Sequence, residues 1–133
     1  MKIFFLNLFQ NVLDLKCLIF INRRWIIEKI SYDDFKFLTS SGRLEILYLC
    51  KTIVTSKTGE IIPYESLLDH TPELKRLSLE YNHYLQLSQK FIEKICASNL
   101  EEFGMYQLPI NFETVAFLAT LAKKKPKLRV HLI

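Results

Sequence analysis

Residues 74–79 of this chain have the sequence Leu-Lys-Arg-Leu-Ser-Leu, and this stretch decides the fold. Leu74, Leu77 and Leu79 occupy the first, fourth and sixth positions, and the residues between them are polar. Side chains alternate between the two faces of a β-strand, so Leu77 and Leu79 point to one face while Ser78 points to the other. The stretch therefore predicts a short strand with one buried face and one exposed face.

The same L-x-x-L-x-L pattern recurs along the whole chain, with Phe or Met replacing some of the leucines. The copies begin at Leu15, Leu44, Leu74, Leu100 and Leu128. Successive starts are 26 to 30 residues apart. The last copy is ambiguous, because the alternation of Val130 and Leu132 competes with that of His131 and Ile133. The recurrence predicts about five short strands that stack in parallel, each followed by a return segment.

The return segments carry helix signals. Ser31, Ser88 and Asn111 are good N-cap residues, and Pro63 suits a first helical position. The helices expected after these residues include residues 89–97 and 112–123. Their expected buried residues are Phe35 and Leu38, then Leu67 and Leu68, then Phe91, Ile92, Ile95 and Cys96, and last Val115, Leu118, Leu121 and Ala122. Leu6, Phe9, Val12 and Leu13 also have helical spacing, so a further helix is expected before the first strand.

This alternation of strands and helices resembles the leucine-rich repeat, and its long units resemble the ribonuclease-inhibitor-like and F-box-associated subtypes. The resemblance implies an α/β solenoid, residues 1–133 forming a single domain within a longer array, with a concave parallel sheet and convex helices. A doubly wound α/β domain is the alternative fold. The charged residues between the strand leucines disfavour it, and so does the lack of a glycine-rich phosphate loop.

One position departs from the family pattern. Leucine-rich repeats place Asn or Cys after the strand, where the side chain binds the backbone of the turn. Here only Asn82 fits, and its counterparts are Arg23, Thr52 and Leu108. The turns of these units must therefore be satisfied in other ways, and irregular repeats are expected.

The composition of the chain indicates the cellular compartment of the protein. The chain has 133 residues, 50% of them hydrophobic, and a net charge of +4. Its three cysteines are an odd number without C-x-x-C spacing, which favours a reducing compartment over a disulfide framework or a zinc site. We expect an intracellular protein, cytoplasmic or nuclear, with no membrane span. The run from Lys123 to Lys127 resembles a nuclear localisation signal, but lysines in a last helical turn followed by Pro126 also have a structural explanation.

The sequence predicts no catalytic centre. His70, His83 and His131 lie in different units and form no ligand pair, and no phosphate-loop or nucleophile motif is present. Cys50 is better explained as a packed residue at a strand end than as a nucleophile. We therefore expect no enzymatic activity, no cofactor and no metal. The charge distribution disfavours nucleic acid as a partner, because most of the positive excess sits in one run.

The concave strand face is the candidate binding site. Its exposed positions should combine apolar, aromatic and charged side chains, which are the types that interfaces use as energetic anchors. The predicted partner-binding residues are Ile19, Ile46, Tyr48, Arg76, Ser78, Tyr81, Glu102 and Tyr106. The alternative is that Ile19, Ile46 and Tyr48 are covered by the N-terminal segment of the chain or by further repeats.

The resemblance implies a protein-protein interaction scaffold. F-box proteins use such repeats to hold substrates of ubiquitin ligases, so the chain is expected to act as such a recognition arm, with the ligase core bound through an F-box that this sequence lacks. The alternative is a purely structural role as part of a larger solenoid, because both ends of the chain look uncapped. The sequence does not identify the partner.

Overall fold

The computed structural model describes residues 2–5, 15–21, 27–80, 87–108 and 112–132. In chain order its elements are β1 (Lys2–Phe5), β2 (Cys17–Ile21), β3 (Glu28–Ser31), α1 (Tyr32–Leu38), β4 (Ile46–Leu49), β5 (Thr52–Thr55), α2 (Tyr64–Leu67), the 3-10 turn η1 (Leu68–His70), β6 (Arg76–Glu80), α3 (Gln89–Ala97), β7 (Glu102–Tyr106), α4 (Phe112–Lys124) and β8 (Arg129–Leu132). The expected helix around residues 6–13 lies outside the described residues.

The main sheet contains the five strands that the repeat predicts. Its order is β1-β2-β4-β6-β7-β8, and the strands from β2 to β8 are parallel. One column of paired residues consists of Leu18, Leu47, Leu77, Phe103 and Val130. A second column consists of Phe20, Leu49, Leu79, Met105 and Leu132. The predicted in-register ladder is confirmed, and the ambiguous last copy adopts the Val130 and Leu132 alternation.

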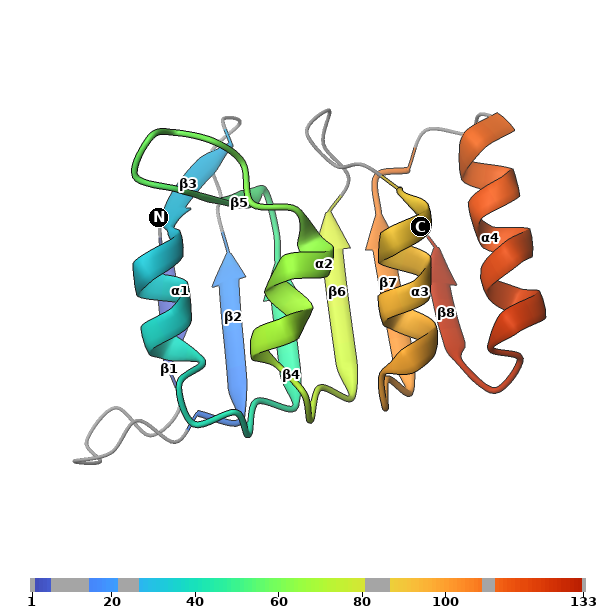
Figure 1. Cartoon of the computed structure of the whole chain (residues 1–133), viewed down its shortest axis with the longest axis horizontal. Helices are drawn as coiled ribbons and strands as arrows, with labels where there is room; N and C mark the ends of the chain where they lie inside the picture. The colour runs from blue at the N-terminus through green and yellow to red at the C-terminus, as the bar shows by residue number, and fades with distance from the viewer. Residues whose placement is uncertain (1, 6–14, 22–26, 81–86, 109–111, 133) are drawn as a thin grey trace.

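The helices form a single layer on one face of this sheet (Figure 1). Each parallel strand pairs with the next along the chain, so every crossover has the same sense and returns over the same face. The column residues of β2, β4, β6 and β7 and the inner helix residues form one buried cluster between the two layers. The doubly wound alternative, which needs helices on both faces, does not describe this arrangement.

The helix starts follow the predicted caps. Ser31 Oγ accepts a hydrogen bond from the Asp34 backbone at 3.1 Å, and Ser88 Oγ accepts one from Phe91 at 3.2 Å. These bonds satisfy amide groups that have no partner inside the first helical turn. Pro63 is the residue before α2 and not its first helical residue, a shift of one position from the prediction.

The predicted inner face of α4 is partly wrong. Val115 is 57% exposed, and Ala122 is exposed as well, whereas Phe117 and Leu121 are buried. Phe117 stacks on Phe91 of α3 with ring centroids 6.1 Å apart. Phe117 and Leu121 together bury more apolar surface than Val115 and Ala122 would, so they determine how the helix is rotated.

The turns after the strands show how the irregular repeats are satisfied. Lys51 and Gln107 adopt the left-handed conformation, with φ of 51° and 60°. Each lies two residues after the last core residue of its strand, so the two turns are equivalent. At the position where the expected repeat pattern calls for Asn, Thr52 is fully buried, and its hydroxyl donates to the Cys50 carbonyl oxygen at 2.9 Å. Leu108 is half-buried against the core instead, while Asn82 and Arg23 lie outside the described residues.

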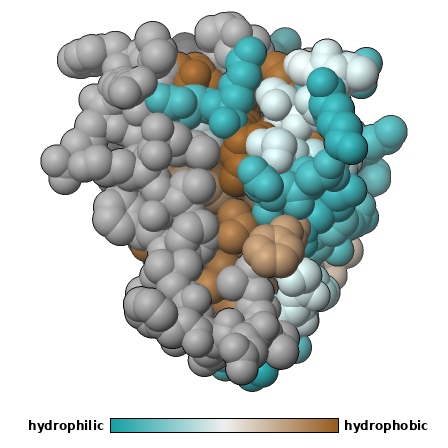
Figure 2. Space-filling model, turned by 90° about the vertical axis from the view of Figure 1, so that its left-hand side faces the viewer, coloured by the Kyte–Doolittle hydropathy of each residue, from teal (hydrophilic) through white to brown (hydrophobic). Residues whose placement is uncertain are grey.

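Two features were not predicted from the sequence. β1 pairs antiparallel with β2, and β3 pairs parallel with β5 in a separate small sheet. The small sheet lies near one end of the main one, close to α1 (Figure 1). Figure 2 looks onto this end and shows hydrophilic side chains gathered on one side of the described surface, with a strip of apolar side chains beside them.

Candidate functional site

The sheet face opposite the helices holds most of the predicted binding residues. We call it the outer sheet face, and on the parallel strands it includes Cys17, Ile19, Ile46, Tyr48, Arg76, Ser78, Glu80, Glu102, Gly104, Tyr106, Arg129 and His131. Because side chains alternate along each strand, these positions are fixed by the burial of the leucine columns on the other face. Tyr81, the remaining predicted residue, lies outside the described residues.

Glu102 lies at the centre of a charged cluster on this face. Its Oε2 lies 3.3 Å from Arg76 Nε on β6 and 3.9 Å from Arg129 Nη2 on β8. Its Oε1 lies 2.5 Å from His131 Nε2, also on β8. The Glu102 side chain is 26% exposed, while the three basic side chains are at least half exposed. Three basic groups thus surround one carboxylate and remain accessible to an external anion.

A shallow depression lies beside this cluster, with a volume of about 40 Å³. Tyr48, Ser78, Gly104 and Tyr106 contribute to its lining. A Cβ atom on Gly104 would lie 2.9 Å from Ser78 Oγ and 3.4 Å from the Tyr106 hydroxyl oxygen. The missing side chain at Gly104 therefore makes room for both neighbours.

Ser78 differs from its predicted exposure, because it is only 6% exposed. Its side chain is short, and the longer side chains of Tyr48 and Tyr106 line the same depression. Ser78 therefore shapes the floor of the site, while the tyrosines and Arg76 offer the contact surface.

The apolar half of the outer sheet face lies over β2 and β4. Ile19 pairs with Tyr48, and Cys17 pairs with Ile46, which in turn pairs with Arg76 on β6. Ile19, Ile46 and Tyr48 are all partly exposed. The predicted contiguity of these residues with Arg76 is confirmed. Burial raises the pKa of the Cys17 thiol, so at neutral pH this group is a protonated thiol and not a reactive thiolate.

A second charged row crosses the sheet where the strands begin. Glu45 Oε1 lies 3.1 Å from Lys75 Nζ, and Glu45 Oε2 lies 3.9 Å from Lys16 Nζ. The hydrogen bond with Lys75 lowers the pKa of the Glu45 carboxyl, and the same bond raises the pKa of Lys75. Opposite charges therefore face one another on successive strands.

Sequence reasoning missed Arg129 and His131 as members of the site. The signal was present, because the alternation of Val130 and Leu132 places both basic residues on the opposite face. The competing alternation in the same six residues masked it, and only pairing with β7 selects between the two.

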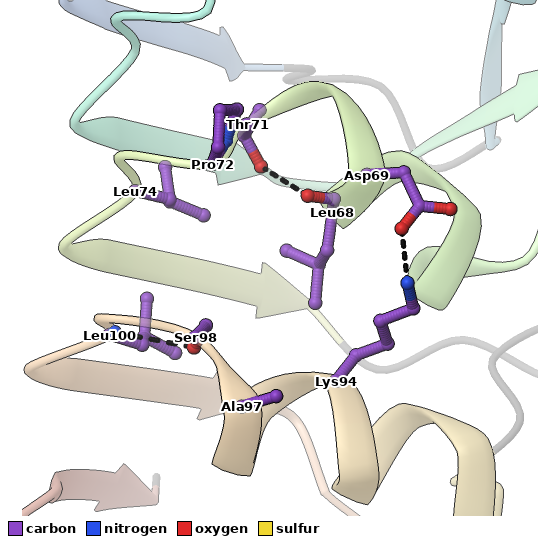
Figure 3. A pocket seen from close by; sticks show the side chains of 9 residues that line it. All are labelled: Leu68, Asp69, Thr71, Pro72, Leu74, Lys94, Ala97, Ser98 and Leu100. Carbon is purple, nitrogen blue, oxygen red and sulfur yellow. Dashed lines mark hydrogen bonds and ion pairs between the residues drawn. The ribbon is translucent and has the colours of Figure 1, made fainter.

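The helix layer also carries a pocket, with a volume of about 280 Å³, between η1 and the C-terminal end of α3 (Figure 3). Leu68, Leu74 and Leu100 line it, and an ion pair between Asp69 and Lys94 lies at its side (Figure 3). Its walls are residues that join one repeat to the next, and no group suited to acid-base chemistry other than this ion pair lines it.

The other candidate catalytic residues from the sequence, His70 and Cys50, are partly buried among neighbouring side chains and form no catalytic arrangement in the described part of the chain. The Tyr32 hydroxyl oxygen lies 2.7 Å from His70 Nε2, and the Phe35 ring packs edge-on against the same imidazole. Burial, followed by the nearby Glu80, raises the pKa of the Cys50 thiol. His83 lies outside the described residues. The described side chains include no cluster of three or more His, Cys, Asp or Glu residues placed to hold a metal ion.

The lysine run has a clear structural role. Lys123 and Lys124 lie in the last turn of α4, which ends just before Lys125. Lys125 Nζ donates to the carbonyl oxygens of Ile95 at 3.1 Å and Ser98 at 2.5 Å, at the C-terminal end of α3. An ammonium group at this place adds a donor at the helix end, where the Ile95 carbonyl oxygen also accepts from the backbone and the hydroxyl of Ser98.

Comparison of the sequence with protein-family models and with curated proteins gives no match. Within the described ranges, no helix combines the length and the apolar character needed to span a lipid bilayer.

Proposed function

We propose that the chain is a leucine-rich-repeat-like solenoid segment, that it acts as a non-catalytic scaffold, and that its outer sheet face binds a partner protein. The observation that carries the proposal is that the Glu102 cluster and the apolar surface formed by Ile19, Ile46 and Tyr48 lie next to each other on the same sheet face. Exposed ion pairs contribute only about 0–1 kcal/mol each to folding, so stability gives little reason for such a cluster. The same groups suit recognition, because they supply directional hydrogen bonds beside an apolar surface.

The composition of the face indicates the chemistry of the partner. Arg76, Arg129 and His131 share a single carboxylate, so the cluster has positive charge to spare for an acidic side chain. Tyr48 and Tyr106 offer aromatic area with few rotatable bonds, which lowers the entropy lost on binding. The fitting partner is a protein surface that presents a carboxylate next to apolar side chains.

Two finer assignments accompany this proposal. In the first, the chain is the substrate-recognition arm of an F-box-type ubiquitin ligase adaptor, an assignment that rests on the resemblance of the repeats. In the second, the chain is a structural part of a larger solenoid and the outer sheet face is covered by other segments. The partial exposure of Ile19, Ile46 and Tyr48 favours a binding role.

The test is affinity capture of partner proteins by the full chain and by a Tyr48→Ala, Arg76→Ala double variant. Both side chains point away from the leucine columns, so the variant should keep its thermal unfolding midpoint while losing the captured partner. A Phe37→Ala, Lys36→Ala variant is the matched control, because these exposed residues lie on α1 in the helix layer.

Three outcomes discriminate among the alternatives. Loss of the partner in the Tyr48 and Arg76 variant alone supports the outer sheet face. Equal loss in both variants, or unchanged capture in both, contradicts it. Recovery of ubiquitin-ligase core subunits with the full chain would support the F-box assignment.

A further inference from the structure

Among the described residues, no strand pairs with the outer edge of β8. β8 is the terminal strand of the sheet order and pairs, among the described residues, only with β7. In the first core column, Leu18, Leu47, Leu77 and Phe103 are at most 2% exposed, whereas Val130 is 36% exposed. The apolar column therefore continues to the last strand and is open on its far side.

The backbone at this edge repeats a hydrogen-bonding arrangement used three times inside the sheet. The Lys16 carbonyl oxygen accepts from Glu45 and Ile46, the Glu45 carbonyl from Lys75 and Arg76, and the Lys75 carbonyl from Glu101 and Glu102. The residue in the same register on β8 is Leu128, one before the pair formed by Glu102 and Arg129. Its carbonyl oxygen, with the outward-facing groups of Val130, is ready to accept a further parallel strand.

The side chains at this edge favour a particular charge on a strand that pairs with it. Along one register, Arg76 on β6, Glu102 on β7 and Arg129 on β8 alternate in sign, and Glu102 contacts both of its neighbours. Lys16, Glu45 and Lys75 repeat this alternation at the start of the strands. The Arg129 side chain is 64% exposed, so its outer side is free for a second carboxylate. Opposite charges on adjacent strands stabilise their pairing, and like charges oppose it.

We propose that the outer edge of β8 binds an extended segment of a partner protein as an additional parallel strand, with an acidic residue beside Arg129 and a large apolar residue beside Val130. The incoming main chain bonds to the Leu128 carbonyl, the apolar residue covers the open column, and the acidic residue extends the charge alternation. This site shares Arg129 with the outer sheet face and differs from it in its use of main-chain hydrogen bonds.

A peptide from the chain itself provides the probe. Residues 99–107 contain Glu102 and Phe103, which already lie beside Arg129 and Val130 from the β7 side. The experiment titrates this synthetic peptide into the ¹⁵N-labelled full chain and follows the backbone amide resonances of residues 128–132. A second peptide with Glu102→Lys tests the charge requirement.

The matched protein variants are Arg129→Glu and Lys127→Glu, which change the net charge equally at exposed positions. We expect Arg129→Glu to weaken binding of the parent peptide about tenfold and to favour the Glu102→Lys peptide instead. We expect Lys127→Glu to leave the dissociation constant within about twofold of the parent value, because an exposed charge outside the contact contributes little. Arg129→Gln removes the charge without placing a carboxylate near Glu102, and its affinity should be intermediate.

Several results would overturn the proposal. One is that Arg129→Glu and Lys127→Glu weaken binding of the parent peptide equally. Others are that Arg129→Glu does not change which of the two peptides binds more tightly, or that the peptide shifts only amide resonances of other strands. Self-association of the chain that Arg129→Glu abolishes would show instead that a second copy occupies the edge. Because the Tyr48→Ala, Arg76→Ala variant leaves β8 unchanged, it should bind the peptide normally, which separates this site from the outer sheet face.

Discussion

Replacing Gly104 by alanine perturbs the floor of the outer sheet face at a single carbon atom. The new Cβ would lie 2.9 Å from Ser78 Oγ, and Ser78 is only 6% exposed, so its hydroxyl has little room to turn. Overpacking of this kind costs about 1–3 kcal/mol. Alanine in a strand recovers roughly 0.5–1 kcal/mol of backbone entropy relative to glycine. We expect Gly104→Ala to lower the free energy of unfolding by about 1 kcal/mol.

The assay is urea denaturation of the full chain, followed by circular dichroism, with a double-mutant cycle. Ser78→Ala removes the closest atom, so Gly104→Ala made in that background should lose most of its cost. Ser78→Ala by itself is the control for removal of the hydroxyl. The reasoning is refuted if Gly104→Ala is as stable as the parent, or if its cost is the same with and without the Ser78 hydroxyl.

Three further predictions concern the core, the helix joints and the charged row. Leu77→Ala, at a position 2% exposed, should cost about 2–5 kcal/mol in urea denaturation, and a cost below 1 kcal/mol would contradict its central place in the column. Lys125→Met should cost about 1 kcal/mol by removing the ammonium bonds to the Ser98 and Ile95 carbonyl oxygens, of which the Ile95 oxygen keeps its bonds from Ser98, whereas Lys124→Met, at an exposed position, should cost almost nothing. Because the folded pKa of Glu45 is lowered, its stabilisation is present above its ordinary value of 4.5 and is lost as pH falls through the folded pKa. The stability difference between the parent and Glu45→Gln should therefore shrink in acid, and a difference independent of pH would contradict the pairing.

The strand ladder could be predicted because it depends on a local pattern. Burial of Leu77 and Leu79 fixes the faces of β6, and the same spacing repeated at 26 to 30 residues fixes the neighbouring strands. The helix caps at Ser31 and Ser88 could be predicted for the same reason. Each serine hydroxyl accepts a hydrogen bond from the backbone amide three positions later. The apolar and aromatic half of the site followed from the strand faces for the same reason.

The features that escaped prediction depend on contacts between distant segments. The rotation of α4 follows from Phe117 meeting Phe91 and Phe103, 26 and 14 positions earlier in the chain. The small sheet pairs β3 with β5, two short segments that follow β2 and β4 and lie more than 20 positions apart in the chain. The basic side of the Glu102 cluster needed the register of β8, which the last six residues leave ambiguous until they pair with β7.

Site-specific photo-crosslinking in cells can show whether the outer sheet face is the partner-binding surface. A benzophenone side chain would replace Tyr48 on the outer sheet face and, in a separate chain, Phe37 on α1, which is 65% exposed. If a partner binds this face, we expect a discrete protein adduct from the Tyr48 position that Arg76→Ala abolishes, and no such adduct from the Phe37 position. An adduct from Phe37 but not from Tyr48, or no adduct from either position, would contradict it.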